Sequence, residues 1–372
     1  MKMLSVRPNI FMFNEFNQFA SEYSLGEDDL IFTHEFLYIP YMKPLGLKCQ
    51  FLFQEKFGVS EPSDTMVNHI FKEIAVMKYN RVIAIGGGTV IDIGKILSLK
   101  RPNDILDLWE GRVAPKKECE LIIIPTTCGT GSEVTNISIL EITGRHVKQG
   151  LANDEMYADK AVLILEFLKK LPLTIFMHSS IDALIHAAES FLSPRSTEYT
   201  EMFAKKAIEK IICGYNAMVQ RGSEYRNEII GEFAVGSNFA GIAFGNTGVG
   251  AVHAMSMTFG GAYHIPHGEA NYEFFTTVFR AYSQKNPNGK IRELNKIIAD
   301  ALCCKAGDDV YTCLENVLNT LIVRKPLKEF GMKADECEIF ADTTIASQQR
   351  LLINNYVPLT RDELANIYKA LY

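Results

Sequence analysis

The chain has 372 residues, of which 47% are hydrophobic and 22% are charged, values that are ordinary for a water-soluble protein of about two domains. Its net charge of −6, with Lys and Arg scattered among Asp and Glu, excludes the basic face that nucleic-acid binding requires. Residues 1–20 lack the apolar core of a signal peptide, and the longest aliphatic runs are far shorter than the roughly 20 residues of a membrane helix. We therefore expect a cytoplasmic protein without membrane or nucleic-acid partners, whose eight cysteines, none in a C-x-x-C pair, are reduced thiols.

The first half of the sequence alternates strand-like runs with helical patterns. The runs lie at 29–32, 81–85, 121–124 and 161–165, and a helix from about Val90 to Leu99 follows the second run. Strands separated by helices predict βαβ units and a parallel sheet. From Ser179 onward helical periodicity dominates, as at 200–220, 225–244 and 291–303. We predict an α/β domain at 1–175 and an all-helical domain at 176–372.

A glycine-rich turn follows the strand-like run that begins at Arg81. Residues 81–95 read RVIAIGGGTVIDIGK, so Gly86, Gly87 and Gly88 precede Thr89 and the predicted helix. Three glycines let a ligand approach the backbone, and the start of a helix attracts a pyrophosphate. The segment matches neither a G-x-G-x-x-G motif, because Ile91 takes the third glycine position, nor a P-loop. Taken alone, it is also compatible with a plain strand-to-helix turn.

A second loop of the same kind follows the run at 121–124. Residues 121–133 read LIIIPTTCGTGSE, and their hydroxyl groups can bind phosphate or ribose oxygens. These hydroxyls belong to Thr126, Thr127, Thr130 and Ser132. Two polar, glycine-rich loops at the carboxyl ends of neighbouring parallel strands form the usual ligand crevice of an open α/β sheet. Together the two loops favour a bound nucleotide.

The helical half contains a candidate metal site. Residues 180–192 read SIDALIHAAESFL, which predicts a helix capped by Ser180 with Asp182 and His186 on one face. A hydrogen-bonded Asp–His pair in the core is the simpler alternative. Glu189 is a further candidate on nearly the same face, but we expect it to reach solvent more easily. Residues 248–271 add three histidines, His253, His264 and His267, and Pro266 predicts a helix start beside the last of them. Imidazole and carboxylate ligands together suit Fe(II), Zn(II) or a related ion rather than Ca²⁺ or Mg²⁺.

These motifs jointly resemble the iron-containing alcohol dehydrogenase family. The family pattern GGGS-x-x-D-x-x-K corresponds to residues 86–89 with Asp92 and Lys95, and PTT-x-GTGSE is intact at 125–133. The family's Asp-x-x-x-His and its two later ligands, fourteen residues apart, correspond to Asp182 with His186 and to His253 with His267. The resemblance implies a dehydroquinate-synthase-like fold, with a Rossmann-like parallel-sheet domain, an all-helical domain and the site between them. It also implies NAD as cofactor and Fe(II), or Zn(II) or another divalent ion, as metal, and we expect a homodimer.

Within that family, residues 236–254, 263–272 and 348–356 are similar to a branch that interconverts 4-hydroxybutyrate and succinate semialdehyde with NAD. The mechanism implied is metal-assisted hydride transfer, in which the ion lowers the pKa of the substrate hydroxyl and hydride passes to the nicotinamide. By the same resemblance Lys148 lies near the nicotinamide ribose, although a solvated loop lysine explains it as well. Two alternatives remain, a dehydroquinate-synthase-type lyase and a non-catalytic nucleotide-binding regulator. The resemblance implies these cofactor-binding residues: Gly86, Gly87, Gly88, Thr89, Asp92, Thr126, Thr127, Thr130, Ser132 and Lys148.

Two positions depart from the family pattern. Met257 stands where many members carry a further histidine, so the group that moves the proton is unknown. His34 stands where many members carry an Asp that faces the adenosine ribose, so the preference for NAD over NADP is less secure. For the substrate, Phe244 is a candidate pocket wall, with an ordinary core phenylalanine as the alternative. The candidate hydrogen-bond donors to the substrate carboxylate are His264, Arg350 and Asn354 with Asn355, and more weakly Arg145 and His146.

Overall fold

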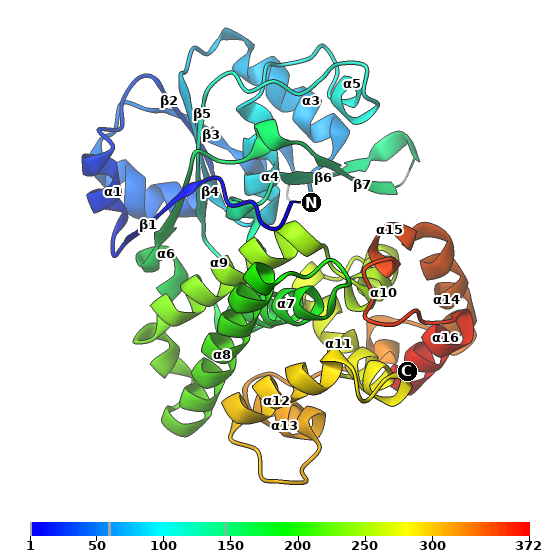
Figure 1. The fold of residues 1–372 in the computed structure, drawn as a ribbon. Helices are drawn as coiled ribbons and strands as arrows, with labels where there is room; N and C mark the ends of the chain where they lie inside the picture. Colours follow the sequence, from blue (N-terminus) through cyan, green and yellow to red (C-terminus); the bar gives the residue numbers. More distant parts are fainter. Residues whose placement is uncertain (1, 59–60, 146) are drawn as a thin grey trace. The chain divides into compact units, whose positions relative to one another are not determined.

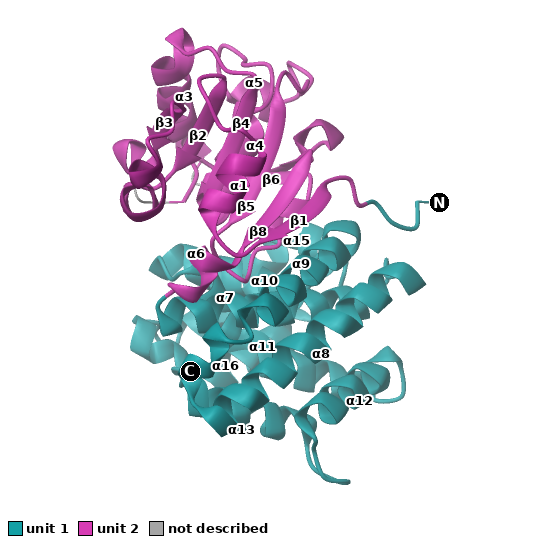
Figure 2. Cartoon of the chain, turned by 90° about the vertical axis from the view of Figure 1, so that its left-hand side faces the viewer, with its two compact units in different colours: residues 1–5, 172–372 teal, residues 6–171 magenta. Residues whose placement is uncertain are grey.

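The computed structural model describes residues 2–58, 61–145 and 147–372. The chain forms two compact units, one of Val6–Leu171 and one of Pro172–Tyr372 together with the residues up to Ser5 (Figure 2). The first unit is α/β and the second is helical, which confirms the predicted fold class. The units divide the chain at Leu171–Pro172, whereas the domains predicted from sequence, 1–175 and 176–372, stay a prediction.

The α/β unit is built on a six-stranded parallel sheet with the strand order β1-β8-β5-β4-β2-β3 (Figure 1). A separate antiparallel pair, β6 and β7, follows the loop after β5. The helices of this unit include α1 (Phe16–Glu22), α3 (Asp64–Glu73) and α4 (Gly88–Leu97). The strands are β1 (Asn9–Phe13), β2 (Asp29–Thr33), β3 (Gln50–Phe53), β4 (Arg81–Gly86), β5 (Glu120–Pro125), β6 (Ile137–Ile142), β7 (Val147–Ala152) and β8 (Lys160–Ile164).

Both faces of the sheet are buried, because helices pack against each of them. Successive side chains of a strand point to opposite faces and so enter different clusters. In β4, Val82 and Ala84 belong to one hydrophobic cluster, which includes α3 and α4. Ile83 and Ile85 belong to another, which includes α1. This double burial explains why the central strands read as continuous apolar runs. It also brings the ends of β4 and β5 side by side, where Gly86 pairs in register with Pro125.

Helices α7 to α16 make up nearly all of the second unit, which is described without gaps from Pro172 onward. The central helix α7 packs against α8, α9 and α11, and α10 packs against α11, α14 and α15. None of the helices in the described part of the chain is long and apolar enough to cross a bilayer. The helices are α7 (Leu173–Leu192), α8 (Glu198–Arg221), α9 (Ile230–Thr247), α10 (Ala251–Tyr263), α11 (His267–Lys285), α12 (Lys290–Leu302), α13 (Val310–Leu321), α14 (Glu336–Ser347), α15 (Gln349–Leu352) and α16 (Arg361–Leu371).

The prediction that Ser180 caps a helix is wrong. Helix α7 begins at Leu173, with Pro172 as its N-cap residue, so Ser180 lies two turns inside it. There Ser180 is buried, its hydroxyl donates to the Met177 carbonyl, and it accepts a hydrogen bond from Tyr215. A serine can occupy a helix interior when its hydroxyl bonds to the preceding turn. Helix α4 begins at Gly88, two residues before the start predicted near Val90.

Candidate metal centre and nucleotide loops

Helix α7 supplies the first half of a compact polar cluster. Asp182 and His186, one turn apart, are both buried in an otherwise apolar stretch. Asp182 Oδ2 lies 3.9 Å from His186 Nδ1. Because α7 is packed on several sides, neither side chain can turn to bulk water, and both depend on partners within the protein.

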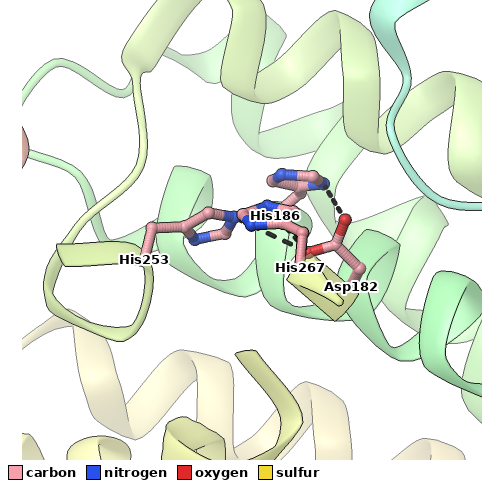
Figure 3. Close-up of side chains that lie close together, drawn as sticks. All are labelled: Asp182, His186, His253 and His267. Atoms are coloured by element: carbon pink, nitrogen blue, oxygen red, sulfur yellow. Dashed lines mark ion pairs between the residues drawn. The ribbon is translucent and has the colours of Figure 1, made fainter. Parts of the chain in front are cut away.

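The second half of the cluster comes from the first turns of α10 and α11. Asp182 Oδ1 lies 3.7 Å from Nε2 of His253 and 3.7 Å from Nε2 of His267 (Figure 3). Pro266 is the N-cap residue of α11, so the helix start expected beside His267 is observed. One ligand atom from each of Asp182, His186, His253 and His267 lies within 4.8 Å of the other three. The structure therefore brings together the four residues that the sequence put forward as metal ligands.

The cluster fits a divalent transition-metal ion. Nε2 of His253 is buried and makes no hydrogen bond to any described residue, and its 3.7 Å separation from Asp182 is too long for one. Burial alone would raise the pKa of Asp182, but the neighbouring imidazoles hold that pKa below its ordinary value, so the carboxylate is an anion. Three imidazoles and one carboxylate are a donor set for Fe(II) or Zn(II).

Glu189 corrects a sequence-based expectation, because it does not reach solvent. The residue is 4% exposed, and its carboxylate accepts hydrogen bonds from the backbone N–H groups of Gly250 (2.9 Å) and Val252 (2.8 Å). Its Oε2 also lies 2.6 Å from Nδ1 of His253. The start of α10 covers Glu189, a contact between residues about sixty positions apart. By holding Nδ1, the carboxylate directs Nε2 of His253 toward the cluster.

Asn271 is a second supporting residue, and the sequence analysis missed it. It is fully buried one turn after His267, and its amide donates to Asp182 Oδ1 at 2.6 Å. The same nitrogen lies 3.1 Å from His267 Nε2, and the Asn271 carbonyl oxygen accepts a hydrogen bond from Ser256. Its spacing of four from a candidate ligand was the available signal.

The candidate substrate-binding residues differ in the contacts that they make. The half-buried Phe244 ring of α9 stacks on His186, with ring centroids 4.2 Å apart and an angle of 15°. His264 is exposed, ends α10 in a left-handed conformation with φ of 54°, and makes no hydrogen bond or ring contact with the cluster. Asn354 is buried and donates to the Val249 carbonyl, which identifies it as a structural contact. Arg350 is exposed, and its guanidinium lies 3.9 Å from Met257 Sδ.

In the α/β unit, the three glycines have different surroundings. A Cβ on Gly86 would lie 2.6 Å from the Val90 side chain, so this glycine is required by packing. A Cβ on Gly87 would meet nothing within 4 Å, and one on Gly88 would lie 3.4 Å from Thr130. Gly87 is the N-cap residue of α4, so the open space lies at a helix start. The loop after β5 is tied to this turn, because the Thr126 N–H donates to the Gly86 carbonyl.

Two of the proposed cofactor residues are engaged inside the unit. Ser132 donates to Asp92 Oδ1 at 2.9 Å, and Asp92 Oδ2 accepts the backbone N–H of Ile139. The fully buried Lys95 ammonium donates to Ser132 at 2.6 Å, and burial lowers the pKa of Lys95 to about 8. These contacts hold the loop after β5 against helix α4. The hydroxyl residues that remain partly accessible are Thr89, Thr127 and Thr130.

The remaining candidates lie on β7, on its preceding turn and after β2. Lys148 on β7 forms an ion pair with Glu61, and Arg145 pairs with Glu110. His146 lies outside the described residues. His34 directly follows β2, and its Nδ1 lies 3.0 Å from Glu55 Oε1.

Comparisons with known proteins agree with these motifs. The family model "Iron-containing alcohol dehydrogenase" matches residues 10–164, and "Fe-containing alcohol dehydrogenase family, C-terminal" matches residues 176–372. The chain is 54% identical over 372 residues, 100% of both chains, to 4-hydroxybutyrate dehydrogenase of Clostridium kluyveri. It is 31% identical to long-chain-alcohol dehydrogenase 1 of Geobacillus thermodenitrificans over 79% of this chain and 75% of that one.

Solved structures share the fold at low identity. A 1,3-propanediol oxidoreductase superposes with a TM-score of 0.82 at 21% identity, with 100% of both chains covered. A sulfoacetaldehyde reductase from Bifidobacterium kashiwanohense, solved in complex with NAD+, gives a TM-score of 0.84 at 21% identity, covering 100% of this chain and 99% of that one.

Proposed function

The chain belongs to the iron-containing alcohol dehydrogenase family and is an oxidoreductase, and from this we propose that it interconverts 4-hydroxybutyrate and succinate semialdehyde with NAD. The choice of substrate rests on the 54% identity, over the full length of both chains, to a 4-hydroxybutyrate dehydrogenase. The family resemblance found from the sequence is thereby confirmed. The cluster on α7, α10 and α11 would hold the metal ion that such a reaction uses, which supports the proposal.

The proposed metal ligands are Asp182, His186, His253 and His267, with Fe(II) as the ion and Zn(II) as the alternative. When bound, such an ion supplies Lewis acidity toward an alcohol or carbonyl oxygen. The protein's part is to hold the four ligand atoms together. Asn271 fixes Asp182, and Glu189 fixes His253, so the ligands are oriented before the ion arrives.

The proposed cofactor site is the pair of loops after β4 and β5. The open backbone at Gly87 and the start of α4 favour a pyrophosphate, which the helix dipole attracts. The accessible Thr127 and Thr130 hydroxyls are suited to phosphate or ribose oxygens. Lys148, which forms an ion pair with Glu61, is proposed to lie near the nicotinamide ribose. NAD itself supplies the hydride-accepting ring.

The substrate end of the site has one proposed wall and no assigned proton carrier. The Phe244 ring, stacked on His186, leaves a flat apolar surface beside the ligand cluster. Oxidation of an alcohol releases one proton for each hydride transferred. Met257, one turn after His253, has no titratable group, so that proton passes to solvent or to another group.

The test is an NADH-oxidation assay on protein reconstituted with Fe(II) without oxygen, using succinate semialdehyde and butyraldehyde. We expect one metal ion per chain and a clear preference for the aldehyde with the carboxylate. Turnover of butyraldehyde alone would contradict the substrate. Absence of stoichiometric metal and of any turnover would favour a nucleotide-binding regulator instead, and release of a product without net NADH consumption would favour a lyase.

We further propose that the enzyme is a cytoplasmic homodimer. No helix in the described part of the chain could span a bilayer, and its cysteines form no disulfide, both of which are compatible with that location. The molar mass in solution, measured by light scattering, checks the assembly. A single mass of one chain would contradict the dimer.

A further inference from the structure

Arg350 is an arginine without an acidic partner near the ligand cluster. Its guanidinium forms no ion pair with a described carboxylate, and it contacts the Met257 thioether, a weak acceptor. The side chain keeps solvent access, yet burial by surrounding atoms lowers the pKa of Arg350. A cation in this position loses part of its hydration and gains no anion in return.

The position of Met257 places this cation beside the proposed metal ligands. Met257 follows His253 by four residues on α10, so the two side chains share one face of the helix, about one turn apart. The Arg350 guanidinium therefore contacts the residue that lies one helical turn after His253 on this face of α10.

The backbone that carries Arg350 is anchored to the start of the same helix. The buried Asn354 amide donates to the Val249 carbonyl at 3.1 Å and lies 3.4 Å from the Arg350 carbonyl. Gly248 approaches so closely that a Cβ there would lie 2.6 Å from Asn354 Nδ2. The segment is therefore fixed relative to α10, so the backbone from which the Arg350 side chain extends is held in place.

We propose that the Arg350 guanidinium binds the substrate carboxylate and makes the enzyme selective for short ω-hydroxy acids over plain alcohols. This rests on the proposed function, because it requires an alcohol or aldehyde oxygen at the ligand cluster. The planar guanidinium can bind both oxygens of a carboxylate at once. Its contact with the Met257 thioether is too weak to compete with that binding. Among the candidates from the sequence, His264 makes no contact with the cluster, Asn354 donates to the Val249 carbonyl, and Arg145 pairs with Glu110. Arg350 has no acidic partner among the described residues.

The experiment compares kcat/KM for succinate semialdehyde and butyraldehyde, which has the same number of carbons but no carboxylate. Arg350→Met should lower kcat/KM for succinate semialdehyde by about ten- to hundredfold, the range expected for one charge-assisted contact, and change the butyraldehyde value little. Arg350→Lys keeps the charge without the planar fork and should recover part of the loss. Arg292→Met, which neutralises an exposed arginine on α12, is the matched control and should change neither value.

The ratio of the two kcat/KM values is taken within one preparation, so partial loss of folded or metal-loaded protein cancels from it. Succinate gives a second readout, because its inhibition constant against butyraldehyde should rise in Arg350→Met and stay unchanged in Arg292→Met. An equal loss on both aldehydes, with unchanged succinate inhibition, would overturn the role of Arg350. If the wild type itself fails to prefer succinate semialdehyde, the proposed function fails first, and the two failures are distinguished.

Discussion

Glu189 Oε2 lies 2.6 Å from Nδ1 of His253, and this contact decides which ring nitrogen faces the other three candidate ligands. With Nδ1–H donating to the carboxylate, Nε2 carries the lone pair on the side of Asp182. The Glu189 carboxylate also accepts two backbone N–H groups at the start of α10. One buried anion thus orders both the helix start and the ligand that the helix carries.

Glu189→Gln should weaken metal binding while leaving the four candidate ligands in place. A glutamine amide has one oxygen, so its NH₂ group would face a backbone N–H donor of α10 in place of an acceptor. We expect metal affinity to fall about ten- to hundredfold, the usual effect of losing such a partner, as measured by competition with a chelator. Glu198→Gln, at the exposed start of α8, is the control and should leave the affinity unchanged. Equal affinities in all three proteins would show that Glu189 serves only the fold.

The sequence was most informative where local spacing decides the geometry. Asp182 and His186 share a helix face because they are four residues apart, and the parallel sheet follows from apolar runs separated by helices. Burial could not be inferred in the same way. Glu189 is covered by α10 and Asn271 contacts Asp182 across α7 and α11, and both contacts join residues more than sixty positions apart. The start of α7 was misplaced because Ser180 is a good cap residue in isolation, whereas packing extends the helix to Pro172.

His267→Ala should abolish metal retention and turnover while the fold is kept. His267 lies in the first turn of α11 with a partly exposed side chain, so its truncation leaves no closed cavity. Metal content per chain and the thermal unfolding midpoint of the metal-free protein are the two measurements. Asp182→Asn, which removes the only anion among the four, should also lose metal.

His253→Ala supplies the contrast for that experiment. It removes the partner of the buried Glu189 carboxylate, so the metal-free protein should lose about 1.5–3 kcal/mol of stability, the value of a hydrogen bond to a charged group. His267→Ala should not show this loss. A His267→Ala protein that keeps its full metal content and activity would remove His267 from the ligand set.

Gly87→Val should raise the KM for NADH by at least about tenfold, a loss of roughly 1.4 kcal/mol in binding, without lowering the unfolding midpoint. A Cβ at Gly87 would meet no atom within 4 Å apart from its chain neighbours, so we expect the added bulk to obstruct an incoming ligand rather than the fold. Gly86→Ala is the opposite case, since its Cβ would lie 2.6 Å from the Val90 side chain, and it should destabilise the α/β unit. Unchanged cofactor binding in Gly87→Val would show that the turn is structural.

The last prediction concerns the choice between NADH and NADPH. His34 stands after β2 where an acidic residue was expected, but its Nδ1 lies 3.0 Å from Glu55 Oε1, and the Glu35 N–H donates to the same carboxylate at 3.2 Å. The Glu55 carboxylate therefore lies at the end of β2, although Glu55 is not at the position where many family members carry Asp. Because an anion there repels the 2′-phosphate of NADPH, we expect NADH to be preferred.

Glu55→Gln should narrow that preference, measured as the ratio of kcat/KM for the two cofactors, by up to about fivefold, because interactions between partly exposed charges are worth no more than about 1 kcal/mol. The effect should shrink as salt is added, since screening weakens a repulsion through solvent. Glu73→Gln, at the exposed end of α3, carries the same change of net charge and should leave the ratio unaltered. A wild type that uses both cofactors equally, or a ratio that Glu55→Gln leaves unchanged at low salt, would show that Glu55 does not discriminate between them.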